Sequence, residues 1–176
     1  MQPATDQGLY IHVPFCHQRC HFCAFYLEIH HPRAAAEFVD SLLTELRLYA
    51  DSSPFDHSPL GSIYFGGGTP TTLSPDQLTR ILSAAKDTFG LASDGEVTVE
   101  AHPGSVTPAS LRQLRRGGFT RISFGAESMN QTELDRVGRP GSPFNTKEVI
   151  VAACDAGFEN INLDLMYGLP GQTLHS

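Results

Sequence analysis

Residues 62–82 read SIYFGGGTPTTLSPDQLTRIL and hold one complete unit of strand, loop and helix. The run from Ser62 to Phe65 predicts a strand, and it leads directly into three glycines. The stretch Ser74-Pro75-Asp76-Gln77 is typical of a helix start, with an N-cap serine, a proline at the first helical position and a capping-box glutamine. The helix that follows carries apolar residues at helical spacing, at Leu78, Ile81, Leu82, Ala85 and Phe89.

The same order of strand and helix repeats along the chain. Strands are predicted over residues 9–13, 62–65, 96–101, 119–124 and 160–166, and helices over 34–50, 75–89, 107–116, 130–137 and 145–156. Such alternation predicts an α/β fold of parallel βα units with right-handed crossovers. We expect a partial TIM-type (β/α) barrel, with a doubly wound sheet as the alternative. A closed barrel needs more strands, so residues 1–176 are expected to form one core domain, truncated after strand five.

Charge and hydropathy exclude several classes of protein. The chain has 12 Lys and Arg against 19 Asp and Glu, a net charge of −7, and no basic run. This argues against a nucleic-acid partner or direct binding to an anionic membrane, so membrane contact is expected to be at most indirect. Residues 1–10 lack the basic and apolar segments of a secretory signal. We therefore expect a cytoplasmic protein.

Three of the four cysteines, Cys16, Cys20 and Cys23, fall within eight residues after the first strand. A disulfide framework would spread its cysteines, so this cluster indicates metal binding or catalysis. One interpretation is a zinc ion with His17 or His21 as fourth ligand. The favoured one is an iron–sulfur cluster held by three thiolates, which leaves one iron open. Cys154 lies on an apolar helix and is expected to be a buried small hydrophobe.

The Cx3Cx2C spacing resembles the signature of the radical S-adenosylmethionine superfamily. In that family a [4Fe-4S] cluster binds the amino and carboxylate groups of S-adenosyl-L-methionine through its open iron. Reduction then cleaves the sulfonium to methionine and a 5'-deoxyadenosyl radical. The resemblance therefore implies a [4Fe-4S] cluster, S-adenosyl-L-methionine and an electron donor of the flavodoxin or ferredoxin type.

Further residues resemble the family's cofactor site. The resemblance implies that Gly67, Gly68 and Thr69 hold the methionyl amino group, that Glu100 holds the ribose and that Arg139 pairs with the carboxylate. Glu127 stands where the family usually carries Gln. Asp164 lies in an apolar strand, where burying an acid is costly unless it is paired. The remaining cofactor-binding predictions are Tyr10 and Phe22. The cysteine loop, the glycine loop, Glu100, Glu127 and Asp164 follow successive strands, so we expect them on one rim.

Four longer motifs resemble the HemN/HemW group, which contains oxygen-independent coproporphyrinogen III dehydrogenases and the heme chaperone HemW. They are YIHVPFC at 10–16, GGGTP at 66–70, ISFG at 122–125 and DLMYGLPGQT at 164–173. The dehydrogenases typically carry a further cysteine where Phe25 stands, and a longer segment before the first strand. Both departures favour the HemW-like branch, which implies a heme or porphyrin ligand, a heme-acceptor protein and a C-terminal domain absent from these residues. The alternatives are coproporphyrinogen dehydrogenase activity and a cluster-binding fragment without radical chemistry.

Overall fold

The computed structural model describes residues 7–52 and 58–176. Five strands form one parallel sheet in the order β1 (Gly8–Val13), β4 (Leu60–Gly67), β5 (Leu91–Ala101), β6 (Arg121–Glu127) and β7 (Asn160–Leu165). The strands lie in the sheet in sequence order, without the reversal that defines a doubly wound sheet. The prediction of a partial (β/α) barrel is therefore confirmed, and the doubly wound alternative is wrong.

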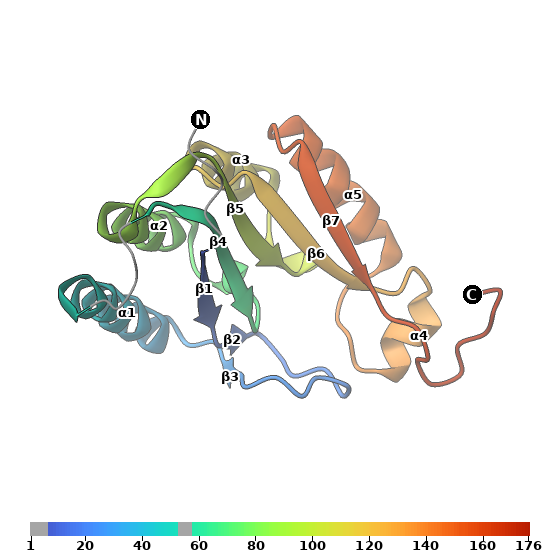
Figure 1. Cartoon of the computed structure of the whole chain (residues 1–176). Helices are drawn as coiled ribbons and strands as arrows, with labels where there is room; N and C mark the ends of the chain where they lie inside the picture. The colour runs from blue at the N-terminus through green and yellow to red at the C-terminus, as the bar shows by residue number, and fades with distance from the viewer. Residues whose placement is uncertain (1–6, 53–57) are drawn as a thin grey trace.

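Helices cover the outer face of this sheet. They are α1 (Pro32–Ser52), α2 (Pro75–Phe89), α3 (Pro108–Arg116) and α5 (Pro143–Asp155), and Figure 1 shows them arranged around the outside of the curved strands. The short helix α4 (Gln131–Arg136) and the 3₁₀ helices η1 (Pro70–Thr72) and η2 (Pro103–Ser105) follow the ends of strands. No helix of the described part of the chain is long and apolar enough to cross a membrane.

The alternation of side chains along each strand separates an apolar core from a polar inner face. Ile63 and Phe65 of β4 are fully buried against the helices, and Phe65 packs edge-on against Phe119 with ring centroids 5.2 Å apart. Tyr64, which lies between them in the strand, faces the other way and is only half-buried. The sheet thus packs its helices with one face and leaves polar groups on the other for a site.

The helix starts follow the predicted chemistry. Ser74 caps α2 in a complete capping box with Gln77, and Thr107 forms the same motif with Ser110 at α3. The prediction that Cys154 is buried is wrong, because this residue is exposed. Helix α5 buries Val149 and Ala153, and a residue one position beyond Ala153 is rotated by about 100° from the core.

A second, two-stranded ladder has no counterpart in the predictions. Strand β2 (Phe15–Cys16) pairs in parallel with β3 (Glu28–Ile29). Its hydrogen bonds include Glu28 N–H to Pro14 O at 2.6 Å and His30 N–H to Cys16 O at 2.8 Å. The ladder closes residues 17–27 into a loop that begins at the first cysteine.

Candidate functional site

The predicted site residues meet around one cavity of about 740 Å³ at the carboxyl ends of the strands. The residues that line it include the three clustered cysteines and Phe22, Gly67, Gly68, Thr69, Glu100, Glu127, Arg139 and Asp164. Tyr10 is not among the residues that line it. Its ring stacks on Tyr64, with centroids 6.0 Å apart, and Tyr64 lines the cavity in its place.

The cysteine loop is fixed at two places besides the β2–β3 ladder. The His21 N–H donates to Val137 O at 2.9 Å, and the Gln18 amide donates to Gly138 O at 3.0 Å. Gly138 has φ +63°, and a Cβ there would lie 2.9 Å from the ring of His21. Close backbone approach at Gly138 thus holds the loop against the segment that carries Arg139.

The three thiols form a donor set suited to a cationic cluster. Cys20 is buried and Cys16 and Cys23 are partly buried, all as free cysteines. Burial raises the pKa of the Cys16 thiol, the hydrogen bond with Thr69 opposes this, and the neighbouring thiols of Cys23 and Cys20 raise it further. Neighbouring thiols hinder one another's ionisation, so a bound cation would favour the all-thiolate state. The residues present fit a cluster held by three thiolates.

The arrangement of these thiols bears on the zinc interpretation. In residues 7–52 and 58–176, no three His, Cys, Asp or Glu side chains are grouped so that they could hold one metal ion. A zinc site needs its ligands around a single ion, whereas a four-iron cluster can take each thiolate on a different iron.

The glycine loop after β4 packs directly on the segment that leads into the cysteine loop. The Gly68 N–H donates to Val13 O at 2.8 Å, and the Thr69 N–H donates to Phe15 O at 2.7 Å. Gly67 has φ +113°, and a Cβ there would lie 2.7 Å from the imidazole of His12. Only glycine fits this approach, which brings the two loops together at the cavity.

Glu100, at the end of β5, is held from two sides. Tyr64 donates to its Oε1 at 2.6 Å, and the Gly67 N–H donates to its Oε2 at 3.2 Å. Burial raises the pKa of Glu100, while the two hydrogen bonds lower it. Tyr64 was not among the predicted site residues, because its contact with Glu100 depends on how β4 and β5 pair.

Glu127 occupies an unusual backbone position. Its φ is +62°, and it is the only residue besides glycine with a positive φ in the described ranges. The pairing of β6 with β7 shifts register between Gly125 and Glu127, as at a β-bulge. Burial raises the pKa of this carboxyl, and the nearby Arg139 opposes the rise.

Arg139 reaches the same region from the loop after α4. Its Nη2 lies 3.4 Å from Oε1 of Glu127 and donates to Gly125 O, while Nη1 donates to Sγ of Cys20 at 3.7 Å. The Arg139 and Glu127 side chains are each 14% exposed. This guanidinium therefore connects the strand end of β6 with the cysteine loop.

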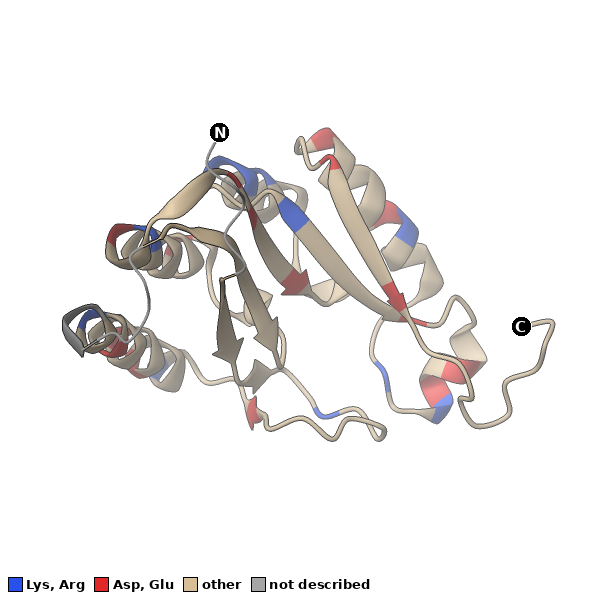
Figure 2. Ribbon diagram, viewed as in Figure 1, with Lys and Arg blue, Asp and Glu red and all other residues tan. Residues whose placement is uncertain are grey.

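Asp164 lies at the cavity but not in the surroundings that the sequence predicted. It is exposed, because β7 is an edge strand, so the argument from the cost of burial does not apply. It is nevertheless paired: Ser123 Oγ donates to Oδ2 at 3.0 Å and Asn162 Nδ2 donates to Oδ1 at 2.8 Å. Figure 2 shows acidic positions towards the arrowheads of β5 and β7, at the same end of the sheet.

His102 also lines the cavity, although it was not among the predicted site residues. Its Nε2–H donates to Pro140 O at 2.9 Å, and its Nδ1 accepts from the Gly104 N–H at 2.9 Å. This pairing fits the neutral ring. Burial, followed by the charge of Arg139, lowers the pKa of His102 to about 4. It therefore stays uncharged beside the guanidinium.

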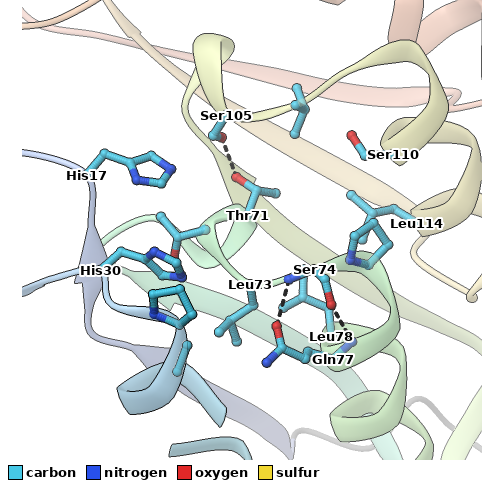
Figure 3. Close-up of a pocket in the computed structure, with 15 residues that line it drawn as sticks. His17, His30, Thr71, Leu73, Ser74, Gln77, Leu78, Ser105, Ser110 and Leu114 are labelled. Atoms are coloured by element: carbon cyan, nitrogen blue, oxygen red, sulfur yellow. Dashed lines mark hydrogen bonds between the residues drawn. The ribbon is translucent and has the colours of Figure 1, made fainter.

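A second cavity of about 440 Å³ lies between the first turns of α1, α2 and α3. Figure 3 shows His17 and His30 on one side of it and the hydroxyl residues Thr71, Ser74 and Ser110 across from them. Those three hydroxyls are hydrogen-bonded within the chain, to Ser105, Gln77 and Thr107. Of the predicted cofactor residues and cysteines, none lines this cavity.

Comparison with known proteins identifies the family. A family model described as the radical SAM superfamily matches residues 10–176. The heme chaperone HemW of Bacillus subtilis is 36% identical over 169 residues, which are 96% of this chain and 44% of that protein. The oxygen-independent coproporphyrinogen III oxidase of Salmonella typhimurium is 33% identical over 175 residues, covering 99% of this chain and 38% of that protein.

A solved structure agrees with this result over nearly the whole chain. Coproporphyrinogen III oxidase (HemN) from Escherichia coli, described as a radical SAM enzyme, superposes with a TM-score of 0.87 at 31% identity, covering 97% of this chain and 39% of that one. The chain thus spans less than half the length of these relatives. The predicted resemblance to the HemN/HemW group is confirmed. With the superfamily model matched from residue 10 to residue 176, the chain belongs to the radical SAM superfamily.

Proposed function

We propose that this protein binds a [4Fe-4S] cluster through Cys16, Cys20 and Cys23 and holds S-adenosyl-L-methionine beside it, in the cytoplasm. The observation that carries the proposal is the single cavity that the three cysteines share with Glu100, Glu127, Arg139 and Asp164. When bound and reduced, the cluster would supply the electron that cleaves the sulfonium. That electron would come from a donor of the flavodoxin or ferredoxin type.

The chain's own residues would bind and orient the cofactor. Gly67, Gly68 and Thr69 would offer backbone groups to the methionyl amino group, since glycine permits close approach. Arg139 would face the carboxylate, and Glu100, already oriented by two donors, would accept from the ribose hydroxyls. Phe22 would pack against the cofactor, Asp164 would accept a further hydrogen bond, and Tyr10 would act only through Tyr64.

We further propose that the complete protein acts as a HemW-like heme chaperone, which would bind heme and pass it to an acceptor protein. Support comes from the similarity to HemW proteins and from Phe25, an exposed aromatic at the cavity wall where the dehydrogenases typically carry a cysteine. The second candidate is coproporphyrinogen III oxidation, supported by the similarity to proteins of that name.

Anaerobic reconstitution with iron and sulfide tests the cluster. We expect about four irons and four sulfides per chain, and an electron paramagnetic resonance signal of the reduced cluster that changes when S-adenosyl-L-methionine is added. Cys16→Ser should lose the cluster, while Cys154→Ser, at an exposed cysteine outside the cavity, should keep it. One tightly bound zinc without iron would contradict the proposal.

The two candidate functions are separated with the full-length protein. A heme chaperone should bind heme, seen as a Soret band, and leave coproporphyrinogen III unchanged under anaerobic reduction. Conversion of coproporphyrinogen III to protoporphyrinogen IX would instead support the oxidase.

A further inference from the structure

We propose that Glu127 competes with the ligand's carboxylate for the guanidinium group of Arg139, and so limits how tightly the site holds ligands that carry a carboxylate. The inference rests on the proposed function, because it takes S-adenosyl-L-methionine and its relatives as the ligands. It assigns Glu127 a role in affinity and not in the reaction itself.

The first observation is that Arg139 already has partners within the chain. Its Nη2 donates to Gly125 O and pairs with Glu127 Oε1 at 3.4 Å, and its Nη1 donates to Cys20 Sγ. An incoming carboxylate prefers two parallel N–H donors of one guanidinium. It would have to share these donors with Glu127 or displace it.

The second observation is that the backbone directs Glu127 to this position. The left-handed φ of +62° is unfavourable for a side chain such as Glu, and the register shift at 125–127 turns the strand end. Met166 directly follows β7, and its N–H donates to Glu127 O at 2.8 Å, which fixes this turn. The carboxylate is therefore held near Arg139 by the main chain as well as by charge.

The third observation is the charge of the cavity. The described residues that line it include three carboxylates, Glu100, Glu127 and Asp164, and Arg139 as the one Arg or Lys. A ligand carboxylate would be the fourth carboxylate in a cavity that holds one guanidinium. Replacing Glu127 with the isosteric, neutral Gln removes one negative charge and one competitor without opening space.

Equilibrium dialysis with the anaerobically reconstituted protein tests the inference by binding alone. The first ligand is S-adenosylhomocysteine, which has the carboxylate but no sulfonium charge that Glu127 could attract. Glu127→Gln should lower its Kd by about tenfold or more, the scale of one charge-assisted hydrogen bond. The second ligand, 5'-methylthioadenosine, lacks the amino-acid moiety, and its Kd should stay the same.

Control variants separate this effect from changes in net charge and folding. Glu148→Gln removes the same charge from an exposed position on α5 and should change neither Kd. Glu127→Asn, which tolerates the left-handed backbone, should repeat the tightening if the longer Gln is poorly accommodated.

Each remaining outcome counts against a defined claim. If the parent protein binds S-adenosylhomocysteine and both Glu127 variants bind it equally or more weakly, the proposed competition is overturned. The proposed function is not affected by that outcome. Equal tightening of 5'-methylthioadenosine also overturns it, because the effect would not pass through the carboxylate. No binding of either ligand to any variant overturns the proposed function and this inference together.

Discussion

The hydroxyl of Tyr64 donates a 2.6 Å hydrogen bond to Oε1 of Glu100, 36 residues further along the chain. The register explains the contact: Tyr64 pairs with Thr98, so Glu100 is its diagonal neighbour on the same face of the sheet. Burial and then this hydrogen bond raise the pKa of Tyr64, which keeps the phenol a donor. Tyr64 thus orients the carboxylate that is proposed to hold the ribose.

Tyr64→Phe should destabilise the protein by about 2 kcal/mol, because it leaves a half-buried carboxylate without its short hydrogen bond. Denaturant unfolding measures this. Loss of the bond also raises the pKa of Glu100, which is the proposed acceptor for the ribose hydroxyls. Binding of 5'-methylthioadenosine, which contains the ribose, should therefore weaken more than binding of methionine, which lacks it.

Tyr26→Phe is the matched control for this change. Tyr26 donates to Glu28 at 2.7 Å, but on the exposed surface and outside the cavity. Its loss should cost little stability, since exposed pairs contribute little. Equal losses in both variants would show that burial of the Tyr64 pair does not matter.

Gly67→Ala should destabilise the protein by several kcal/mol, because it combines a positive φ with a Cβ placed 2.7 Å from His12. Gly168→Ala separates the two causes: Gly168 has φ +78° but no heavy atom within 4 Å of its Cβ position. Gly168→Ala should lower the free energy of unfolding by only about 1 kcal/mol, because only the penalty for the positive φ applies there. Thermal unfolding of the two variants compares them, and similar losses would contradict a steric role at Gly67.

The sequence predicted the parts of this fold that depend on local chemistry. Ser74 and Gln77 form the expected capping box, and consecutive βα units give the expected parallel sheet. The rim was predictable for the same reason, because parallel strands end on one side. Cys154 was predicted wrongly, since the apolar run from Val149 to Cys154 does not indicate which side of α5 faces the core.

Features that depend on tertiary register could not be predicted. The β2–β3 ladder has two residues per strand, too few for any periodicity. Tyr10 and Tyr64 pair directly and lie at the same level of the sheet. Tyr64 meets the cavity because β4 lies between β1 and β5, which places Tyr64 beside Glu100. The positive φ of Glu127 arises from the bulge against β7, which no local pattern near residue 127 encodes.

Ser123→Ala should destabilise the protein by about 1–2 kcal/mol and loosen Asp164. Ser123 is 1% exposed, and its Oγ both donates to Asp164 and accepts from Asn162 Nδ2 at 2.9 Å. Denaturant unfolding checks the loss. Ser83→Ala, at an exposed position on α2, should not reduce stability. A neutral Ser123→Ala would mean that Asn162 alone positions Asp164.

His102→Gln should remove a pH dependence of stability. The folded protein keeps His102 neutral down to about pH 4, whereas the unfolded chain takes up a proton near pH 6.5. Unfolding therefore takes up a proton between these values, and the parent protein loses this stabilisation as pH falls through the window. Above pH 6.5 the contribution is fully present.

The measurement is the difference in unfolding free energy between the parent protein and His102→Gln from pH 7 to pH 4.5. Taking the difference cancels the opposite trend from Glu100 and Glu127, whose raised pKa values favour the folded state as pH falls. The difference should shrink on acidification, by at most about 1.4 kcal/mol per pH unit. A constant difference would show that His102 titrates alike in both states, and that burial and the charge of Arg139 do not hold the ring neutral.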